Sequence, residues 1–336
     1  MVNKERENFF KNVGTDLQDV NLDGVFALIK KAVKENNKDC LKYQNIISVG
    51  AENEGKKLHK KDLIEILNKI YKIWWDNWLI PSSKLKNHYQ ATTIKRCVDE
   101  KLYYPSSEKQ LNIYEIMDEL SYANLFEDVC RFQNRYFCIV DTNFLSVERK
   151  KYVRYFYQTK LYLNIKLKNR VELADKLIEK AMQKDLPLTF KFALDDDRTD
   201  NFVFYTNFCE VKETADMIDE IKAEYPDLFE DCKVCNPLLA KYRGYMGFGE
   251  ESYVSSYNFG RSDILLETYS ELAKKYNYDK NTLTDEELKS EFKKQCYNKL
   301  IDPENFSRNK LFDEFEFEED EKNSKVEISI NEDISK

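Results

Sequence analysis

Residues 160–206 read KLYLNIKLKNRVELADKLIEKAMQKDLPLTFKFALDDDRTDNFVFYT, and their hydrophobic side chains follow two different periods. In some segments they alternate with other residues, which predicts β-strands. In others they recur every three or four residues, which predicts amphipathic helices. The strands expected are 160–166, 188–194 and 202–206, and the helices are 169–184 and, just beyond the stretch, 211–225. This β-α-β-β-α order predicts an α+β fold with a small sheet.

The flanking residues divide the chain into three parts. We expect a helical N-terminal region over 1–145, a mixed α+β domain over 146–312 and an acidic, disordered tail over 313–336. Helical periodicity in the first part appears at 21–38, at 61–78 and from about residue 107. Two further helices are expected near the end of the second part, at 262–276 and 285–300.

Negative charge is concentrated at the C-terminal end. The chain has 336 residues, with 53 Lys and Arg against 61 Asp and Glu, and 313–336 alone contributes −7 to the net charge of −8. The nearly neutral remainder argues against nucleic-acid binding, which needs a basic surface. No apolar run is long enough to span a membrane, and the charged first residues do not form a secretory signal. We therefore expect a cytoplasmic protein without nucleic-acid or membrane partners.

Cysteine and histidine usage argues against a metal centre. The eight cysteines are scattered through the chain, which is typical of a protein from a reducing compartment. Cys232 and Cys235 form one CxxC pair, but no second pair or nearby histidine completes a zinc site. The only histidines, His59 and His88, lie in the N-terminal half. We expect no metal, and two ordinary thiols near a turn remain the simpler interpretation of the CxxC pair.

Glycine is scarce except in one stretch. Four of the eight glycines fall within 244–260: Gly244, Gly247, Gly249 and Gly260. Such a concentration indicates irregular backbone that bends tightly or approaches a ligand. The spacing fits neither a dinucleotide fingerprint nor a P-loop. The stretch is therefore expected to be a long loop, either structural or functional.

A lysine in the second predicted strand is a candidate general base. Lys191 lies between Phe190 and Phe192. Its side chain either faces solvent, as most lysines do, or is covered, in which case burial would lower its pKa and suit it to accept a proton. Tyr205 ends the next strand, and antiparallel pairing would bring it close to Lys191. Arg198 and Asp200 occupy the turn between the two strands.

Further cations lie in and around the glycine-rich stretch. Lys241, Arg243 and Arg261 could join Lys191 and Arg198 in one pocket. Several cations in one pocket suit a dianion such as phosphate, because arginine binds its oxygens in a bidentate manner. Alternatively, these cations pair with the abundant surface carboxylates.

Four motifs, in this order, resemble a known family. They are YLN at 162–164, LPLTFKFAL at 186–194, RTDNFVFY at 198–205 and NPLLAKYRGYMGFGEESYVSSYNFGRSDILLE at 236–267. From about 150 to 272 the chain resembles the HopA-type effector family, whose domain also occurs as the lyase component of class V lanthipeptide biosynthesis. Asn258 stands where the family has a serine.

The resemblance implies phosphothreonine lyase chemistry on a phosphorylated precursor peptide. Such a lyase removes the α-proton of phosphoserine or phosphothreonine and expels phosphate, leaving dehydroalanine or dehydrobutyrine. It needs no cofactor, and it implies a kinase-like protein and a cyclase as partners. The roles carried over are the base for Lys191, and phosphate binding for Arg198, Arg243, Arg261 and the neighbouring Lys241. Tyr205 would orient the substrate, and Tyr162 and Asn164 would line the pocket.

One departure from the family pattern leaves a second function open. The effector lyases use a histidine as general acid, and this chain has Asn164 at the best-matching position and no histidine after His88. Tyr162, Tyr205 or water would have to supply the proton, or phosphate would leave unprotonated. The alternative is a non-catalytic effector or binding module that recognises a phosphorylated peptide or protein.

Overall fold

The computed structural model describes residues 2–67, 69, 130–133, 135–139, 158–184, 186, 188–251, 256–276 and 283–310. Three predictions fall wholly or mainly outside these residues. They are the helix expected at 61–78, the helix expected from about 107, and the disorder of 313–336. Among the described residues, no helix is long and apolar enough to cross a membrane.

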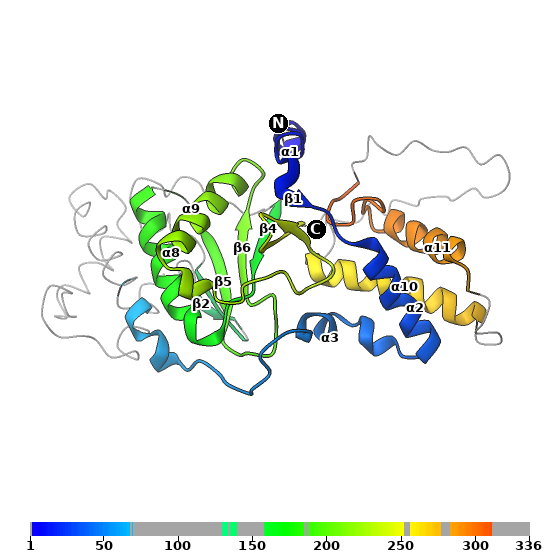
Figure 1. Cartoon of the computed structure of the whole chain (residues 1–336), viewed down its shortest axis with the longest axis horizontal. Coiled ribbons are helices and arrows are strands. Elements are labelled where there is room, and N and C mark those ends of the chain that lie inside the picture. Colours follow the sequence, from blue (N-terminus) through cyan, green and yellow to red (C-terminus); the bar gives the residue numbers. More distant parts are fainter. Residues whose placement is uncertain are drawn as a thin grey trace, which may run out of the picture.

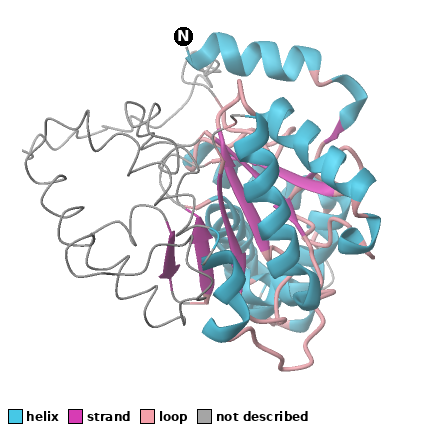
Figure 2. Cartoon of the chain, turned by 90° about the vertical axis from the view of Figure 1, so that its left-hand side faces the viewer, coloured by secondary structure: helices cyan, strands magenta, loops and turns pink. Residues whose placement is uncertain are grey.

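One antiparallel sheet runs through the molecule (Figures 1 and 2), in the strand order β1-β7-β8-β4-β6-β5-β3-β2. Its strands are β1 (Leu17–Gln18), β2 (Cys130–Gln133), β3 (Tyr136–Ile139), β4 (Thr159–Leu163), β5 (Thr189–Ala193), β6 (Phe202–Thr206), β7 (Ala240–Tyr242) and β8 (Met246–Glu250). The predicted strands at 160–166, 188–194 and 202–206 are confirmed as β4, β5 and β6. The sheet has more strands than the sequence predicted. The additional strands β1, β2, β3, β7 and β8 were missed because their residues show no clear alternation of apolar and polar side chains.

Helices make up the rest of the described fold, and the α+β class is confirmed. The α-helices are α1 (Val2–Asn12), α2 (Leu22–Glu35), α3 (Tyr43–Ser48), α8 (Arg170–Lys184), α9 (Val211–Glu224), α10 (Tyr257–Tyr276) and α11 (Asp285–Asn298). Short 3₁₀ segments are Gly14–Asp16, Lys38–Leu41, Lys60–Leu63, Leu167–Asn169 and Pro226–Phe229. The helices predicted from periodicity at 21–38, 169–184, 211–225, 262–276 and 285–300 correspond to α2, α8, α9, α10 and α11.

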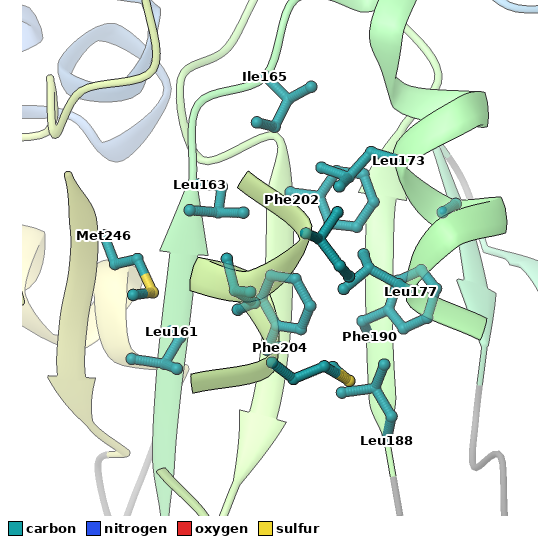
Figure 3. Packing of buried hydrophobic residues seen from close by; sticks show 14 of the residues in the cluster. Leu161, Leu163, Ile165, Leu173, Leu177, Leu188, Phe190, Phe202, Phe204 and Met246 are labelled. Carbon is teal, nitrogen blue, oxygen red and sulfur yellow. The ribbon is translucent and has the colours of Figure 1, made fainter. Parts of the chain in front are cut away.

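One face of the sheet carries the main hydrophobic core (Figure 3). Leu161 and Leu163 of β4 point to the same side as Phe190 of β5 and Phe202 and Phe204 of β6, and all five are buried there beneath α8 and α9. Burying a phenylalanine side chain contributes about 1.5–3 kcal/mol. Since side chains alternate along a strand, the neighbouring residues of these strands belong to the opposite face.

A second core lies on the other side of the sheet, where α2, α10 and α11 pack together (Figure 1). Ile29 of α2, Ile264 of α10 and Phe292 of α11 are buried in it. The first residue of α10, Tyr257, instead packs against Tyr162 of β4, with the ring centroids 6.3 Å apart. The start of α10 thus touches the sheet face that the phenylalanine core leaves uncovered.

The glycine-rich stretch is not the long loop that the sequence predicted. Residues 246–250 form β8, and 257–260 form the first turn of α10. A Cβ atom on Gly249 would lie 2.4 Å from the Tyr257 ring, and one on Gly247 would lie 2.6 Å from Leu239. These two glycines therefore permit close packing of protein side chains on the strand. Of the four glycines in 244–260, only Gly244 has the left-handed backbone conformation expected of a turn, with a φ angle of 77°.

Segments from the first 145 residues contribute to the same sheet and cores. β1 pairs with β7, β3 pairs with β5, and α2 packs on α10. The described helices α1 to α3 agree with the helical character expected of 1–145, but the strands β1, β2 and β3 were not expected. The domain boundary near residue 145 stays a prediction.

Candidate functional site

Lys191 and Tyr205 lie together on the sheet face opposite the phenylalanine core. In the antiparallel register, Lys191 is opposite Val203 and Thr189 is opposite Tyr205. The Lys191 Nζ atom lies 5.6 Å from the centroid of the Tyr205 ring. The same ammonium group lies 4.4 Å from the centroid of the Tyr136 ring of β3. Both distances are within the range of cation–π attraction, which holds a cation at a defined place.

Arg198 reaches the same aromatic ring from the β5–β6 turn. Its guanidinium carbon lies 4.7 Å from the centroid of the Tyr136 ring, and its Nε donates to Asp200 Oδ1 at 2.7 Å. A second nitrogen donates to the hydroxyl of Tyr43 in α3. Burial by itself would lower the pKa of Arg198, but the Asp200 carboxylate outweighs it and raises that pKa. Arg198 is therefore a permanent cation beside Lys191.

Asp200 accepts hydrogen bonds from three side chains at the β5–β6 turn. Besides Arg198, it accepts from Asn258 Nδ2 at 2.9 Å and from the Tyr43 hydroxyl at 3.5 Å. Asn258 in turn accepts from Asn236 Nδ2 at 3.0 Å. The carboxylate is 3% exposed, so these donors replace the water that a buried charge requires.

A second lysine lies on the other side of Tyr205. The Lys160 Nζ atom is 5.1 Å from the centroid of the Tyr205 ring and forms an ion pair with Glu251. The Lys160 side chain is only 9% exposed. Tyr205 therefore lies between the ammonium groups of Lys160 and Lys191. We call the set Lys160, Lys191, Arg198, Tyr136 and Tyr205 the cationic face.

Tyr162 borders the cationic face on β4. Burial, together with the negative charges of Glu251 and Asp200, raises the pKa of its hydroxyl well above the ordinary tyrosine value. The hydroxyl is therefore protonated at any physiological pH and can donate a hydrogen bond.

Asn164 lies just past the end of β4 and is held by neighbouring side chains. Its Oδ1 accepts from Asn201 Nδ2 at 2.7 Å, and its Nδ2 lies 3.4 Å from the Cys235 sulfur. The Asn201 Nδ2 also donates to the carbonyl of Arg198 at 3.0 Å. Asn164 therefore supports the β5–β6 turn, and an amide at this position has no proton to give as an acid.

Arg243 and Lys241 lie apart from the cationic face. Arg243, in the turn after β7, donates to Asp216 at 2.6 Å and to Asp219 at 2.5 Å, both on α9. Since α9 covers the phenylalanine core, Arg243 belongs to the opposite side of the sheet. Lys241 is an exposed residue of the short strand β7. The structure does not bring these two cations to Lys191.

Arg261 is completely buried in α10 and binds the C-terminal segment. Its Nε donates to the carbonyl of Phe306 at 2.7 Å, and one Nη donates to the carbonyl of Arg308 at 3.2 Å. Its guanidinium carbon lies 4.5 Å from the centroid of the Tyr257 ring. These contacts fit a structural role for Arg261 and do not place it with Lys191.

Four residues of the site and its surroundings were missed by sequence reasoning: Tyr43, Tyr136, Lys160 and Glu251. Tyr43 and Tyr136 come from segments far from Lys191 along the chain and carry no local signal of a site. Lys160 has one usable signal, since it alternates with Tyr162 on the first predicted strand and so must share its face. Glu251 follows β8, which the sequence presented as a loop.

No metal site is found in the part of the chain that the structure describes. Cys232 and Cys235 are both half-buried thiols. Burial raises the pKa of Cys232 to about 11, so this thiol is protonated and unreactive at neutral pH. The interpretation of the CxxC pair as ordinary thiols agrees with this environment.

Comparison with known proteins finds structural likeness and little sequence likeness. No family model and no curated protein matches the chain. An effector protein from Pseudomonas syringae pv. tomato is similar with TM-score 0.40 and 11% identity, over 84% of this chain and 100% of that one. An effector protein from Pseudomonas syringae pv. syringae is similar with TM-score 0.44 and 10% identity, over 85% of this chain and 98% of that one. Neither description names a reaction, a substrate or a partner.

Proposed function

We propose that the chain is a phosphoserine/phosphothreonine lyase acting on a phosphorylated peptide, as in lanthipeptide maturation. The observation that carries the proposal is the cationic face. Lys160, Lys191 and Arg198 gather around the rings of Tyr136 and Tyr205, beside the protonated hydroxyl of Tyr162. A base, phosphate-binding cations and a hydrogen-bond donor for the leaving oxygen are groups that favour phosphate elimination.

Lys191 is the base in this proposal. Its Nζ, as the neutral amine, takes the α-proton of the phosphorylated residue. The electron pair of the broken Cα–H bond forms the Cα=Cβ double bond, and the Cβ–O bond breaks so that phosphate leaves with its oxygen.

Arg198 and Lys160 bind the leaving phosphate in this proposal. Asp200 orients the guanidinium of Arg198, and Glu251 orients the ammonium of Lys160. The Tyr162 hydroxyl donates a hydrogen bond to the departing oxygen, and Tyr205 separates the two lysines. The peptide would come from a kinase-like protein and pass to a cyclase, since a dehydro amino acid is an electrophile that a cysteine thiol can attack.

A second candidate is a non-catalytic effector or binding module for a phosphorylated partner. The ion pairs favour it, because Asp200 and Glu251 already form ion pairs with two of the three cations, Arg198 and Lys160. A phosphate group could replace these carboxylates as the partner of the two cations, and such reversible exchange suits binding as well as catalysis. The two candidates share the cationic face and differ in whether Lys191 removes a proton.

Mass spectrometry of a phosphothreonine peptide incubated with the protein distinguishes them. The lyase proposal expects loss of the mass of phosphoric acid with wild type and no loss with Lys191→Ala. Lys191→Arg keeps a cation above Tyr136 but cannot act as a base, and it is expected to bind the peptide without converting it. Lys184→Ala, at the exposed end of α8, is the matched control and is expected to react like wild type.

Two other outcomes would overturn the lyase proposal, and a third would overturn only the role of Lys191. Loss of the mass of metaphosphoric acid would mean hydrolysis. Unchanged peptide that binds wild type and loses affinity for Lys191→Ala would establish the binding module instead. Conversion that persists in both Lys191 variants would remove Lys191 from the mechanism.

A further inference from the structure

The hydroxyl of Tyr43 lies between the two members of the Arg198–Asp200 ion pair. It accepts from Arg198 Nη2 and donates to Asp200 Oδ2 at 3.5 Å. The Arg198 Nε atom donates to the other carboxylate oxygen, Oδ1, at 2.7 Å. Arginine often binds a carboxylate through two parallel hydrogen bonds, from Nε and from Nη2. Here the Tyr43 hydroxyl replaces the second of these bonds, so Arg198 is joined to Asp200 directly through one nitrogen only.

The opposite edge of the Arg198 guanidinium carries hydrogens without a partner among the described residues. The Nη1 atom makes no hydrogen bond there, and it is not one of the fully buried atoms that lack a partner, so it reaches solvent. The Nη2 atom has a second hydrogen on the same edge, because a guanidinium carries five N–H donors. A phosphate group that approaches this Nη1–Nη2 edge can accept two hydrogen bonds from it.

The helix that carries Tyr43 is fixed to the β5–β6 turn. The Thr199 backbone N–H donates to the carbonyl of Ile47 at 2.8 Å, and the Thr199 hydroxyl donates to the same carbonyl at 2.9 Å. Ile47 lies about one turn after Tyr43 in α3. The guanidinium carbon of Arg198 is 5.7 Å from the centroid of the Tyr43 ring. These contacts hold α3 against the turn and keep Tyr43 beside Arg198.

The Tyr43 hydroxyl stays protonated, because burial and then the negative charge of Asp200 raise its pKa above the ordinary tyrosine value. A neutral hydroxyl can accept from Arg198 and donate to Asp200 at the same time. A phenylalanine at this position could do neither. Without the hydroxyl, Arg198 Nη2 would turn to Asp200 Oδ2, and the resulting bidentate pair would draw the guanidinium away from a ligand.

We propose that Tyr43 is a positioning residue that keeps the Nη1–Nη2 edge of Arg198 available to the phosphate group of the ligand. Tyr43 acts through Arg198 and takes no part in proton removal. The inference rests on the proposed function only through the phosphate-binding role of Arg198, which the lyase and the binding module share. It adds that α3, far from Arg198 along the chain, sets the affinity for phosphate.

The affinity for inorganic phosphate tests this inference without any turnover. Isothermal titration calorimetry at constant ionic strength measures the dissociation constant of phosphate. Tyr43→Phe is expected to weaken phosphate binding about three- to tenfold, since the lost hydroxyl acts on phosphate only through Arg198. The matched control is Tyr269→Phe, which also removes a hydroxyl hydrogen bond, to Asn36 at 3.1 Å in the second core. This control is expected to bind phosphate like wild type.

A double-mutant cycle tests whether Tyr43 acts through Arg198. Arg198→Lys keeps the positive charge but lacks the planar fork of nitrogens, and it is expected to weaken phosphate binding. Adding Tyr43→Phe to Arg198→Lys is expected to change the affinity by less than about twofold, because the partner of the hydroxyl is already gone. A general loosening of the fold would instead lower the affinity by the same factor in both backgrounds. Circular dichroism checks that each variant is folded.

Three outcomes would overturn the inference about Tyr43. These are wild-type phosphate affinity in Tyr43→Phe, an equal loss in Tyr269→Phe, and the same loss from Tyr43→Phe with and without Arg198. Absence of phosphate binding to wild type at any concentration up to the solubility limit would also overturn it.

The inference and the lyase proposal fail separately, because elimination is measured by mass spectrometry of the peptide. If Tyr43→Phe binds phosphate like wild type while Lys191→Ala abolishes conversion, the lyase proposal stands without a positioning role for Tyr43. If the expected pattern of phosphate affinities appears without any conversion of peptide, the role of Tyr43 stands and the lyase proposal is wrong.

Discussion

At the residue scale, Tyr136 joins the two cations that the sequence placed on neighbouring segments. Lys191 and Arg198 are seven positions apart along the chain, and both approach the same ring. Burial and the charge of Asp200 raise the pKa of Tyr136, so its hydroxyl stays protonated and adds no negative charge to the face. The ring therefore positions both cations without neutralising either.

We expect Tyr136→Leu to lower the free energy of unfolding by about 2–3 kcal/mol, because it removes a half-buried ring and two cation–π contacts. Tyr136→Phe keeps the ring and should lose about 1 kcal/mol or less. Urea denaturation followed by tryptophan fluorescence measures both. Equal losses for the two variants would mean that the ring does not hold the cations.

At the scale of elements, the contact between β8 and α10 determines how the second helical layer meets the sheet. Gly249 on β8 lets the Tyr257 ring lie directly on the strand. The Tyr257 hydroxyl then donates to the carbonyl of Leu238 at 2.6 Å, just before β7. One residue of α10 thus connects β8 with the segment leading into β7, and the helix brings Asn258 to Asp200.

Gly249→Ala should destabilise the fold by about 1–3 kcal/mol, since its Cβ would overlap the Tyr257 ring and force either the strand or the helix to shift. Gly24→Ala in α2 is the contrasting variant. Its Cβ would meet Asn21 at an ordinary 3.5 Å, so the lower entropy of alanine should stabilise the protein by about 0.5 kcal/mol. Thermal unfolding measures both shifts, and a Gly249→Ala protein as stable as wild type would contradict the close packing.

At the scale of the whole molecule, a buried ion pair connects the two ends of the described chain. Arg6 of α1 donates from Nε and one Nη to the carboxylate of Glu250 at 2.8 and 3.0 Å, and to the carbonyl of Asn309 at 2.7 Å. The Asn309 backbone N–H donates to the same carboxylate at 2.8 Å. Burial raises the pKa of Glu250, and Arg6 opposes that rise.

Removing Arg6 should therefore destabilise the protein in a pH-dependent manner. Arg6→Leu leaves a buried carboxylate without its cation, which costs about 3–5 kcal/mol near pH 7. The pKa of Glu250 would rise further, and a raised carboxyl pKa means that its penalty appears as pH rises above about 4.5. The loss measured by urea denaturation should accordingly be smaller at about pH 4.5 than at pH 7.

The double variant Arg6→Leu/Glu250→Leu is the control for this pair. It removes both charges and should recover most of the stability at pH 7, because the penalty belongs to the unpaired carboxylate. An Arg6→Leu loss that is the same at both pH values would show that packing of the arginine stem, rather than its charge, stabilises the contact.

Local patterns in the amino-acid sequence determined the central elements of this protein. The alternation in 160–166, 188–194 and 202–206 and the helical period in 169–184 predicted β4, β5, β6 and α8, since burial of one face requires those periods. The pairing of β5 with β6 also brought Lys191 and Tyr205 together, as expected for strands joined by a short turn. These conclusions depend on residues that are near one another along the chain.

Only the tertiary structure decided which of the remaining cations join Lys191. Tyr43 and Tyr136 reach the site through helix packing and strand order, which no local period encodes. The alternation of β4 gives the face of Lys160, but only the pairing of β4 with β6 brings it to Tyr205. The ion pairs with α9 hold Arg243 on the opposite side of the sheet. Residues far apart in sequence meet because every helix and strand must bury its apolar face and every strand must pair its edges in one common structure. These long-range contacts are not contained in any local sequence pattern.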